Sequence, residues 1–476
     1  MNADELSGPR YWKSLDDLAE TPAFRDWMER EFPSGASELD GVNRRQFMRV
    51  MAASFGLAGL GMSGCRRPEH VILPYNEQPE NVIPGVPVYF STSMPGVSEH
   101  IPLIAETYSG RPTKLEGNPS YTPFGGGTSI QAQASVLDLY DPDRVTRSRR
   151  DGASVSPAAV RDTLADIRSK HAEDGGAGLV VLAEPSSSPS RARLVRQFRE
   201  TYPEALWAEY SPVPAGNAEA AARSIYGKSL RPLPAFDKAK RIVSLDADFL
   251  SGEGGALGKA RAFSRTRKVA DTSEADRMSR LYSVESTLSS TGAMADHRLR
   301  LATSQMGAFA AKLASRILAR KGGYGATLEA LRAADASLSA DDGWLDACAD
   351  DLLAHEGASL VVAGEHLPPE VHAIAHALND ALGAPGNTLR YAEVPAAAPG
   401  IEDAAARLGG GGVATLVILG GNPVFDAPAD LDWKALQGGA GRVVHLTADH
   451  NETAAAADLV VGRSHYLESW GDGRTF

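Results

Sequence analysis

The strongest constraint on the fold is an alternation of short apolar runs and helical intervals within residues 151–476. The apolar runs have the length of strands and span residues 178–183, 241–248, 359–364, 414–419 and 442–446. Such runs are typical of strands buried on both faces of a sheet. Residues 189–201 and 369–382 have the pattern of helices, and Ser188 is a suitable cap for the first of them. The alternation predicts an α/β fold with parallel strands.

The preceding segment, residues 67–150, is predicted to be rich in loops and strands. Prolines interrupt its apolar runs at Pro68, Pro74, Pro79, Pro84, Pro87, Pro95 and Pro102. Proline limits long helices and favours extended or edge strands. Residues 86–92 predict a strand, and residues 101–108 and 113–119 predict a hairpin around a glycine-containing turn.

The first 66 residues carry the features of an export signal. Arg44 and Arg45 precede Phe47, and an uncharged apolar run follows over residues 50–62. This run is shorter than the roughly 20 residues that a bilayer-spanning helix needs. A basic pair before a short apolar run is typical of a twin-arginine (Tat) signal. The alternative is a buried core helix that follows a chance arginine pair.

Two further features of this leader bear on membrane attachment and docking. Small residues before Cys65 resemble a lipoprotein cleavage site, so Cys65 is either acylated or an unmodified cysteine in an uncleaved signal. Ahead of the arginines, aromatic and aliphatic residues between Tyr11 and Phe32 recur every three or four positions. This spacing predicts amphipathic helices, which would dock on a partner or pack against the rest of the chain.

Composition excludes several classes of site. The only cysteines are Cys65 and Cys348, too few for a cysteine-ligated iron–sulfur cluster, an all-cysteine zinc site or a disulfide framework. The 48 basic and 60 acidic residues give a net charge of -12. This balance argues against a nucleic-acid partner, because nucleic-acid-binding domains carry a basic surplus.

The candidate ligand-binding residues lie in glycine-rich turns after two predicted strands. Gly420, Gly421, Asn422 and Pro423 follow one strand, and residues 364–366 follow another. Open parallel sheets bind ligands at the carboxyl ends of their strands, where backbone amides can hold a phosphate. The spacing matches neither a dinucleotide fingerprint nor a P-loop, so a structural turn is the favoured interpretation.

No set of catalytic or metal-binding residues assembles from the sequence. His372 and His376 stand four residues apart, with His366 nearby, a spacing that zinc sites use. The residues between them include no glutamate, so a core-edge or solvated histidine pair is the favoured interpretation. Ser135 is interpreted as a capping or turn residue rather than a molybdenum ligand, and Cys348 as a buried, inert thiol. We therefore predict no catalytic residue and no metal site.

Longer strings of residues carry a family resemblance. Residues 11–24, 31–33 and 44–48 resemble the extended twin-arginine leader of the large B subunit of alternative complex III, a quinol-oxidising membrane complex. Residues 132–144 and 281–298 are similar to the same branch. Strings in residues 110–119, 420–423 and 449–461 resemble molybdopterin oxidoreductases more broadly. The resemblance spans nearly the whole chain and is loosest between about residues 151 and 230.

The resemblance implies a molybdopterin-oxidoreductase-like α/β fold behind a helical twin-arginine leader. Its parts would be the leader (1–66), a loop- and strand-rich domain (67–150) and a C-terminally incomplete α/β region (151–476). Where the wider family places its cluster cysteines, residues 88–100 contain none, so no local cluster is expected. The remaining half of the family's subunit, with a cysteine-rich ferredoxin-like part that carries iron–sulfur clusters, would lie downstream of a fragment or in a split gene.

Three functions are compatible with these features. The missing cysteines favour a non-catalytic, structural part of alternative complex III, without molybdopterin or another cofactor in this chain. The resemblance implies Tat export, a peripheral position on the periplasmic side of the inner membrane, and contact with a multihaem cytochrome c and polytopic membrane subunits. The alternative is an active molybdopterin-dependent oxidoreductase of the polysulfide, nitrate or formate class. A third hypothesis is an exported α/β binding protein.

Overall fold

The computed structural model describes residues 21–22, 76–77, 79–96, 100–213, 216–322, 329, 331 and 342–474. The chain divides into the units Met1–Glu80 and Asn81–Phe476, and all elements below belong to the second. The predicted signal residues Arg44, Arg45, Phe47 and Cys65 lie outside the described residues. No helix in the described part is long and apolar enough to cross a bilayer.

The first sheet is antiparallel and contains the predicted hairpin. Its strands, in spatial order, are β1 (Val88–Pro95), β2 (His100–Tyr108) and β3 (Arg111–Gly117). Ser109 and Gly110 link β2 to β3 with φ angles of 51° and 79°, and a turn with two positive φ values matches the twist of adjacent strands. Leu103 and Leu115 pack beside α4 (Ile130–Ala134) to form a small core. The hairpin prediction is confirmed.

The second sheet is parallel and contains two of the predicted strands. Its spatial order is β11-β10-β9-β12, with bounds β9 (Arg241–Leu245), β10 (Arg280–Glu285), β11 (His297–Arg300) and β12 (Ser359–Ala363). Its helices are α8 (Ala256–Arg267), α9 (Ser290–Ala293), α10 (Met306–Lys321), α12 (Asp342–Leu353) and α13 (Pro369–Ala381). The strand β9 is shorter than the predicted 241–248, because Asp246 adopts a left-handed φ of 49° that interrupts extended backbone.

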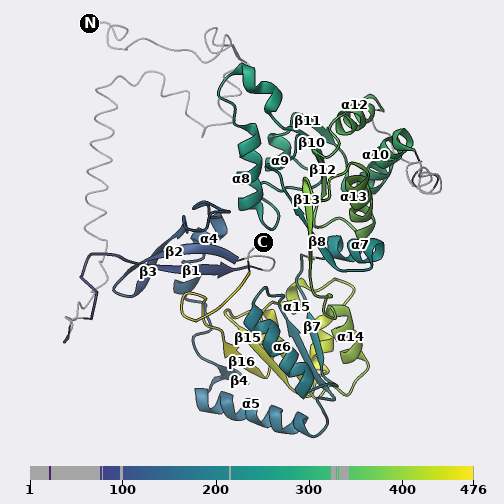
Figure 1. Cartoon of the computed structure of the whole chain (residues 1–476). Helices are drawn as coiled ribbons and strands as arrows, with labels where there is room; N and C mark the ends of the chain where they lie inside the picture. Colours follow the sequence, from purple (N-terminus) through teal and green to yellow (C-terminus); the bar gives the residue numbers. More distant parts are fainter. Residues whose placement is uncertain are drawn as a thin grey trace. The chain divides into compact units, whose positions relative to one another are not determined.

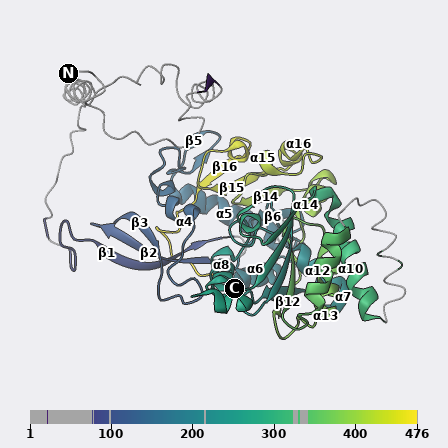
Figure 2. The ribbon, with the colours of Figure 1, turned by 90° about the horizontal axis from the view of Figure 1, so that it is seen from above.

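Helices cover both faces of this second sheet. On one face, Val243 and Val361 pack against α10, α12 and α13, which lie side by side with α7 (Asn217–Tyr226) in Figure 2. On the other face, Ile242 and Leu360 pack against Phe263 of α8. Neighbouring strand residues therefore point into different helix layers, which explains the continuous apolar character of these strands.

The third sheet contains the other three predicted strands. Its spatial order is β5-β4-β16-β15-β14-β6-β7, with bounds β4 (Arg149–Arg150), β5 (Ala153–Ser154), β6 (Leu179–Ala183), β7 (Leu206–Glu209), β14 (Thr415–Leu419), β15 (Val443–Thr447) and β16 (Leu459–Gly462). The five strands from β16 to β7 are parallel. The predicted parallel strands are thus confirmed, and they are divided between two sheets, each with its own covering helices (Figure 1).

The helices of the third sheet are α5 (Pro157–Ala172), α6 (Pro189–Thr201), α14 (Ile401–Gly409), α15 (Pro423–Asp426), α16 (Trp433–Gly438) and α17 (Glu452–Ala455). Leu182 and Ile418 pack with Trp433 on one face, and Val444 packs against α5 on the other. The start of α6 is as predicted, because the Ser188 hydroxyl accepts the Arg191 amide at 3.1 Å.

A short antiparallel ribbon lies beside the second sheet. It pairs β8 (Leu230–Pro234) with β13 (Leu389–Glu393). The Tyr391 hydroxyl of β13 lies 2.8 Å from Nδ1 of His376 on α13, and α13 in turn contacts both α7 and β12. The ribbon is therefore tied to the helices that cover the free side of β12.

Candidate functional site

The candidate site of the second sheet is the carboxyl edge between β9 and β12. The chain runs from β9 to β10 and β11 on one side and later returns to β12 on the other. Such a reversal opens a crevice at the strand ends, which is where open α/β sheets bind ligands. A hollow of about 300 Å³ lies here, and carboxylates of Asp246, Asp248, Glu253 and Glu285 are among its lining groups.

Asp246 is the first of these carboxylates, directly after β9. It accepts the Ser286 amide at 3.0 Å and the Thr303 hydroxyl at 2.7 Å, and Nε2 of His366 lies 3.3 Å away. Burial alone would raise the pKa of Asp246, but these hydrogen bonds outweigh it and lower that pKa. The carboxylate is thus held in its charged form by donors from three loops.

Asp248 occupies the amino end of the short helix α9. Its Oδ1 accepts the Thr291 amide at 3.0 Å and the Thr291 hydroxyl at 2.8 Å, and Ser251 donates to Oδ2 at 2.6 Å. Burial acts to raise the pKa of Asp248, and these donors lower it overall. The backbone amide that an external anion would use at this helix end is already bound to a carboxylate of the chain.

Glu285 ends β10 and closes the same hollow. Its side chain is 4% exposed, accepts the Ser289 hydroxyl at 2.6 Å and forms an ion pair with Arg298. A Cβ atom added at Gly292 would overlap this carboxylate. A residue with a Cβ atom would therefore have to displace this carboxylate, and glycine allows Glu285 to fill the space beside α9.

The predicted turn of Gly420, Gly421, Asn422 and Pro423 lies at the equivalent edge of the third sheet. It follows β14, which lies beside β6 where the strand order reverses. The two glycines have φ angles of 83° and 74°, in the left-handed region that favours glycine. A Cβ atom at Gly420 would overlap the Glu184 carboxylate, which is itself 2.8 Å from Arg463 Nη1.

The Asn422 side chain of this turn is bound within the chain. Asn422 accepts the Thr453 amide at 3.1 Å and the Thr453 hydroxyl at 2.8 Å, and it donates to Glu452 at 2.7 Å. Nearby, Asp472 accepts the Ser190 amide at 3.1 Å in the first turn of α6. A carboxylate of the chain thus again binds a first-turn amide of a helix.

The histidines singled out in the sequence point to different partners. His366 contacts Asp246 as described above. His376, one helix turn beyond His372, contacts Tyr391 and, at 3.2 Å, the Ala218 carbonyl. Among the described residues, no group of three or more histidine, cysteine, aspartate or glutamate side chains is placed to hold a metal ion. His372 and His376 are buried, with 5% and 3% of their surfaces exposed.

Ser135 and Cys348 also occupy structural positions. Ser135 ends α4, and its hydroxyl donates to the Ala132 carbonyl at 2.8 Å and lies 2.7 Å from the Tyr466 hydroxyl. Cys348 is fully buried on α12, and burial raises the pKa of its thiol, which suppresses the reactive thiolate. Its predicted burial is confirmed.

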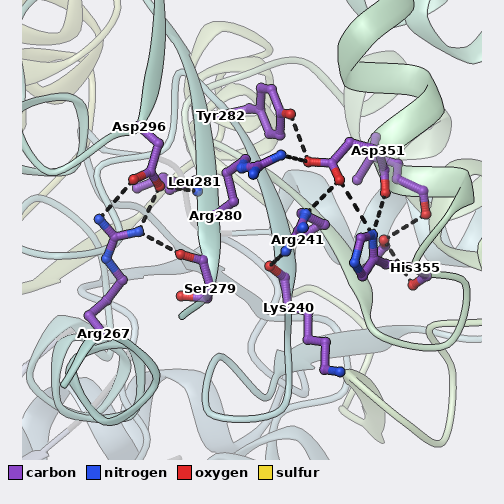
Figure 3. A network of polar contacts seen from close by, with 12 residues as sticks. Lys240, Arg241, Arg267, Ser279, Arg280, Leu281, Tyr282, Asp296, Asp351 and His355 are labelled. Carbon is purple, nitrogen blue, oxygen red and sulfur yellow. Dashed lines mark hydrogen bonds and ion pairs between the residues drawn. The ribbon is translucent and has the colours of Figure 1, made fainter. Parts of the chain in front are cut away.

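A second polar network lies at the opposite, amino end of the second sheet (Figure 3). Asp351 of α12 lies 2.7 Å from Nε of Arg241 and 2.8 Å from Nη1 of Arg280, and Tyr282 donates to it at 2.8 Å. The Arg241 contact is a close ion pair without good hydrogen-bond alignment. Arg241 and Arg280 begin adjacent strands, so the network joins α12 to the sheet rather than forming a binding site.

Sequence reasoning missed the carboxylates as a group. Asp246 and Asp248 were placed inside a predicted strand, although their position just after an apolar run was a usable signal. Asp472 lies far from α6 in sequence, so its contact with Ser190 had no local signal. A dinucleotide cofactor at either edge would bring phosphates toward amides that already bind carboxylates, and like charges repel.

Comparison with solved structures places the fold among known ones. Acetylene hydratase from Pelobacter acetylenicus matches with a TM-score of 0.63 and 12% identity, over 81% of this chain and 65% of that chain. This chain therefore spans less than two thirds of the length of acetylene hydratase. The formyltransferase/hydrolase complex from Methylorubrum extorquens matches with a TM-score of 0.42 and 16% identity, over 66% of this chain and 86% of that chain.

The comparisons support a statement about the fold alone. No protein-family model and no curated protein matches the chain. The similarity to acetylene hydratase shows a mixed α/β fold like that of acetylene hydratase. The coarse fold expected from the sequence is thereby confirmed.

Proposed function

We propose that this chain is a non-catalytic, structural part of a quinol-oxidising respiratory complex of the alternative complex III type. The observation that carries the proposal is that the chain's own carboxylates bind backbone amides at the carboxyl edges of the second and third sheets. Asp248 and Asp472 bind the first-turn amides of α9 and α6, and Asp246 binds the amide of Ser286. Positions at which this kind of sheet binds phosphates are thus filled by the chain's own anions.

The hydrogen bonding of these carboxylates supports an architectural role. Each accepts two or more donors, and the pKa values of Asp246 and Asp248 are lowered although burial opposes this. A catalytic acid or base at neutral pH needs a pKa near the working pH. Carboxylates held in the charged form connect loops instead, and we propose that this is their role here.

The proposed partners follow from the sequence resemblance and from one surface. On the described surface, the edge strand β1 exposes Tyr89 and Phe90 by 60% and 55%, and β1 pairs with β2 alone among the described strands. Exposed aromatic side chains on an open sheet edge are suited to a protein partner. We propose the other subunits of the complex, including a multihaem cytochrome c and polytopic membrane subunits, as those partners.

The remaining parts of the proposal concern location and cofactors. Arg44, Arg45 and Phe47 would direct Tat export to the periplasmic side of the inner membrane, and Cys65 is the candidate site of lipidation. The iron–sulfur clusters of the complex would be held in a downstream ferredoxin-like part. This chain would carry neither a cluster nor molybdopterin.

The test is purification of the full protein, carrying an affinity tag, from its native membranes. We expect quinol-oxidising activity and c-type haem to copurify with it, and molybdenum and tungsten to be far below one atom per chain. Release of the protein as a lone species without c-type haem would contradict the proposed complex. Molybdenum or tungsten at one atom per chain, together with a pterin, would instead establish the active molybdopterin-dependent enzyme.

A further inference from the structure

A cavity of about 590 Å³ lies beside the edge strand β12. Residues of β8 and β13 line it on one side, and residues of α8 and α13 line it from opposite faces of the sheet. Figure 1 shows these four elements around the free side of β12. The volume lies within the range of small-molecule sites, about 300–1,000 Å³.

The cavity has a largely apolar and aromatic wall. Phe236 and Phe249 line it and stack on each other with ring centroids 4.2 Å apart. Phe124 adds a third ring, and each of the three side chains is at most 5% exposed. These rings have almost no free surface themselves, so a flat, apolar ligand would gain contact area on the partly exposed lining residues Leu233 and Ala262 in front of them.

The cations that line the cavity fall into two groups. Arg231 forms an ion pair with Glu219, and Lys259 lies 3.6 Å from Glu253. Arg261, Arg265 and Arg390 also line the cavity, and within the described part of the chain their side chains have no acidic partner. Two acidic residues of the lining, Asp237 and Glu365, likewise have no cation partner there. The three arginines outnumber them.

Two of these arginines are placed to act together. Arg261 and Arg265 are one turn apart on α8, and residues at that spacing share a helix face. Arginine binds carboxylates through two parallel hydrogen bonds. The pair therefore offers a carboxylate-binding position at the cavity. Arg390 of β13 adds a third positive charge to the lining.

The cavity also has a buried acceptor. His372 lines it and is 5% exposed, and its Nε2 has no hydrogen-bond partner among the described residues. Burial lowers the pKa of His372 to about 4, so the ring is neutral at pH 7, and a neutral imidazole has one nitrogen that can accept a hydrogen bond. A buried, unpaired acceptor is destabilising, and a ligand hydroxyl would satisfy it.

The geometry points to a binding site for a small aromatic hydroxycarboxylate, an activity separate from the structural role proposed above. The ring system would lie against Leu233 and Ala262. The carboxylate would pair with Arg261 and Arg265, and the hydroxyl would donate to Nε2 of His372. No covalent step is involved.

The test is direct binding of 6-hydroxy-2-naphthoate to the purified full protein, measured by calorimetry. This probe combines a flat ring system, a carboxylate and a hydroxyl at the far end. We expect saturable binding of one molecule per chain, with weaker binding of 2-naphthoate and of 2-naphthol, each of which lacks one polar group. Equal binding of 2-naphthol, or no binding of the hydroxynaphthoate, would overturn the proposal.

Substitutions of the lining residues test whether the probe binds in this cavity. R261Q/R265Q on α8 should weaken hydroxynaphthoate binding by about tenfold or more. R390Q on β13 should weaken it as well. The matched control R193Q/R196Q removes the same charge from the exposed face of α6 and should leave binding unchanged. H372F should weaken the hydroxynaphthoate and spare 2-naphthoate. Equal effects of the α8 and α6 variants, with unfolding midpoints unchanged, would contradict the site.

Discussion

Asp472 and Ser190, 282 positions apart in the sequence, are joined by two hydrogen bonds. The Ser190 amide donates to the Asp472 carboxylate at 3.1 Å, and the Ser190 hydroxyl donates to it at 2.7 Å. Hydrogen bonds from Ser188 and Ser190 also lower the pKa of Asp472. The segment around residue 472 is thereby fastened to the start of α6, at the edge where β6 and β14 end.

Removal of this carboxylate should expose the first turn of α6. In D472A the Ser190 amide loses its acceptor, so we expect its hydrogen exchange to accelerate by about tenfold or more. Mass spectrometry of peptides covering residues 187–195 measures this. The control D162A removes an exposed carboxylate from α5, and it should leave exchange in these peptides unchanged. Equal exchange in D472A and the unaltered protein would contradict the described contact.

Two buried histidines should make stability depend on pH. Burial lowers the pKa of His372 and of His445 to about 4, against about 6.5 in an unfolded chain. Between these pH values the unfolded chain binds more protons, so stability should fall as pH drops from about 6.5 to about 4, by about 1.4 kcal/mol per pH unit for each histidine. Denaturant midpoints measured across this range test the prediction.

The variant H445L isolates one of the two contributions. Neither ring nitrogen of His445 makes a well-formed hydrogen bond among the described residues, so leucine removes the proton-binding group without stranding a partner. The pH slope should decrease by about one proton's contribution. H450L, at an exposed position, serves as the control for replacement of a histidine by leucine. A slope in H445L equal to that of the unaltered protein would show that His445 does not titrate as proposed.

The network of Figure 3 should contribute strongly to stability. The Asp351 and Arg241 side chains are 13% and 12% exposed, so D351N leaves a buried guanidinium without its counter-charge. We expect a loss of about 3–5 kcal/mol in the free energy of unfolding. D350N removes the neighbouring carboxylate, which is 64% exposed and pairs with Arg320, and should cost less than about 1 kcal/mol. Similar losses of unfolding free energy in D351N and D350N would contradict this difference between the buried and the exposed carboxylate.

Two glycine substitutions should change stability in opposite directions. G292A places a methyl group against the Glu285 carboxylate, so we expect a loss of about 1–3 kcal/mol from overpacking. G307A lies in α10, where its methyl group would meet a Val371 methyl at 3.7 Å, an ordinary contact. Alanine is the better helix former, so G307A should gain about 0.5 kcal/mol. Thermal unfolding compares the two variants, and a stable G292A would count against the described position of Glu285.

The elements that the sequence predicted well are those with a strong local signal. The hairpin at Ser109 and Gly110 needed only turn chemistry, and α6 needed only Ser188 before Pro189. The assignment of strands to two sheets depends on contacts distant in sequence, as between β6 and β14, and no local pattern carries it. Strands such as β8, with the sequence Leu-Arg-Pro-Leu-Pro, were missed because proline and charge break the apolar run.

In the candidate site, too, residues with a local sequence signal were predicted and residues that depend on distant contacts were not. The turn from Gly420 to Pro423 was found because glycine and proline mark it in the sequence. The role of Asp246 was hidden, because its donors Ser286, Thr303 and His366 come from distant loops. Arg261 and Arg265 were not singled out, since arginines on a helix usually face solvent, and only the cavity gives them a common environment.

The carboxylates at the strand ends have a consequence for how the protein matures. Enzymes whose loops close around a bound cofactor must wait for its synthesis and insertion before those loops settle. Here Asp246, Asp248 and Asp472 already neutralise the loop and helix amides, so the loops can close as soon as translation delivers them. Under the proposed structural role these loops fold without insertion of a cofactor, and cells that make no pterin should yield the same folded chain.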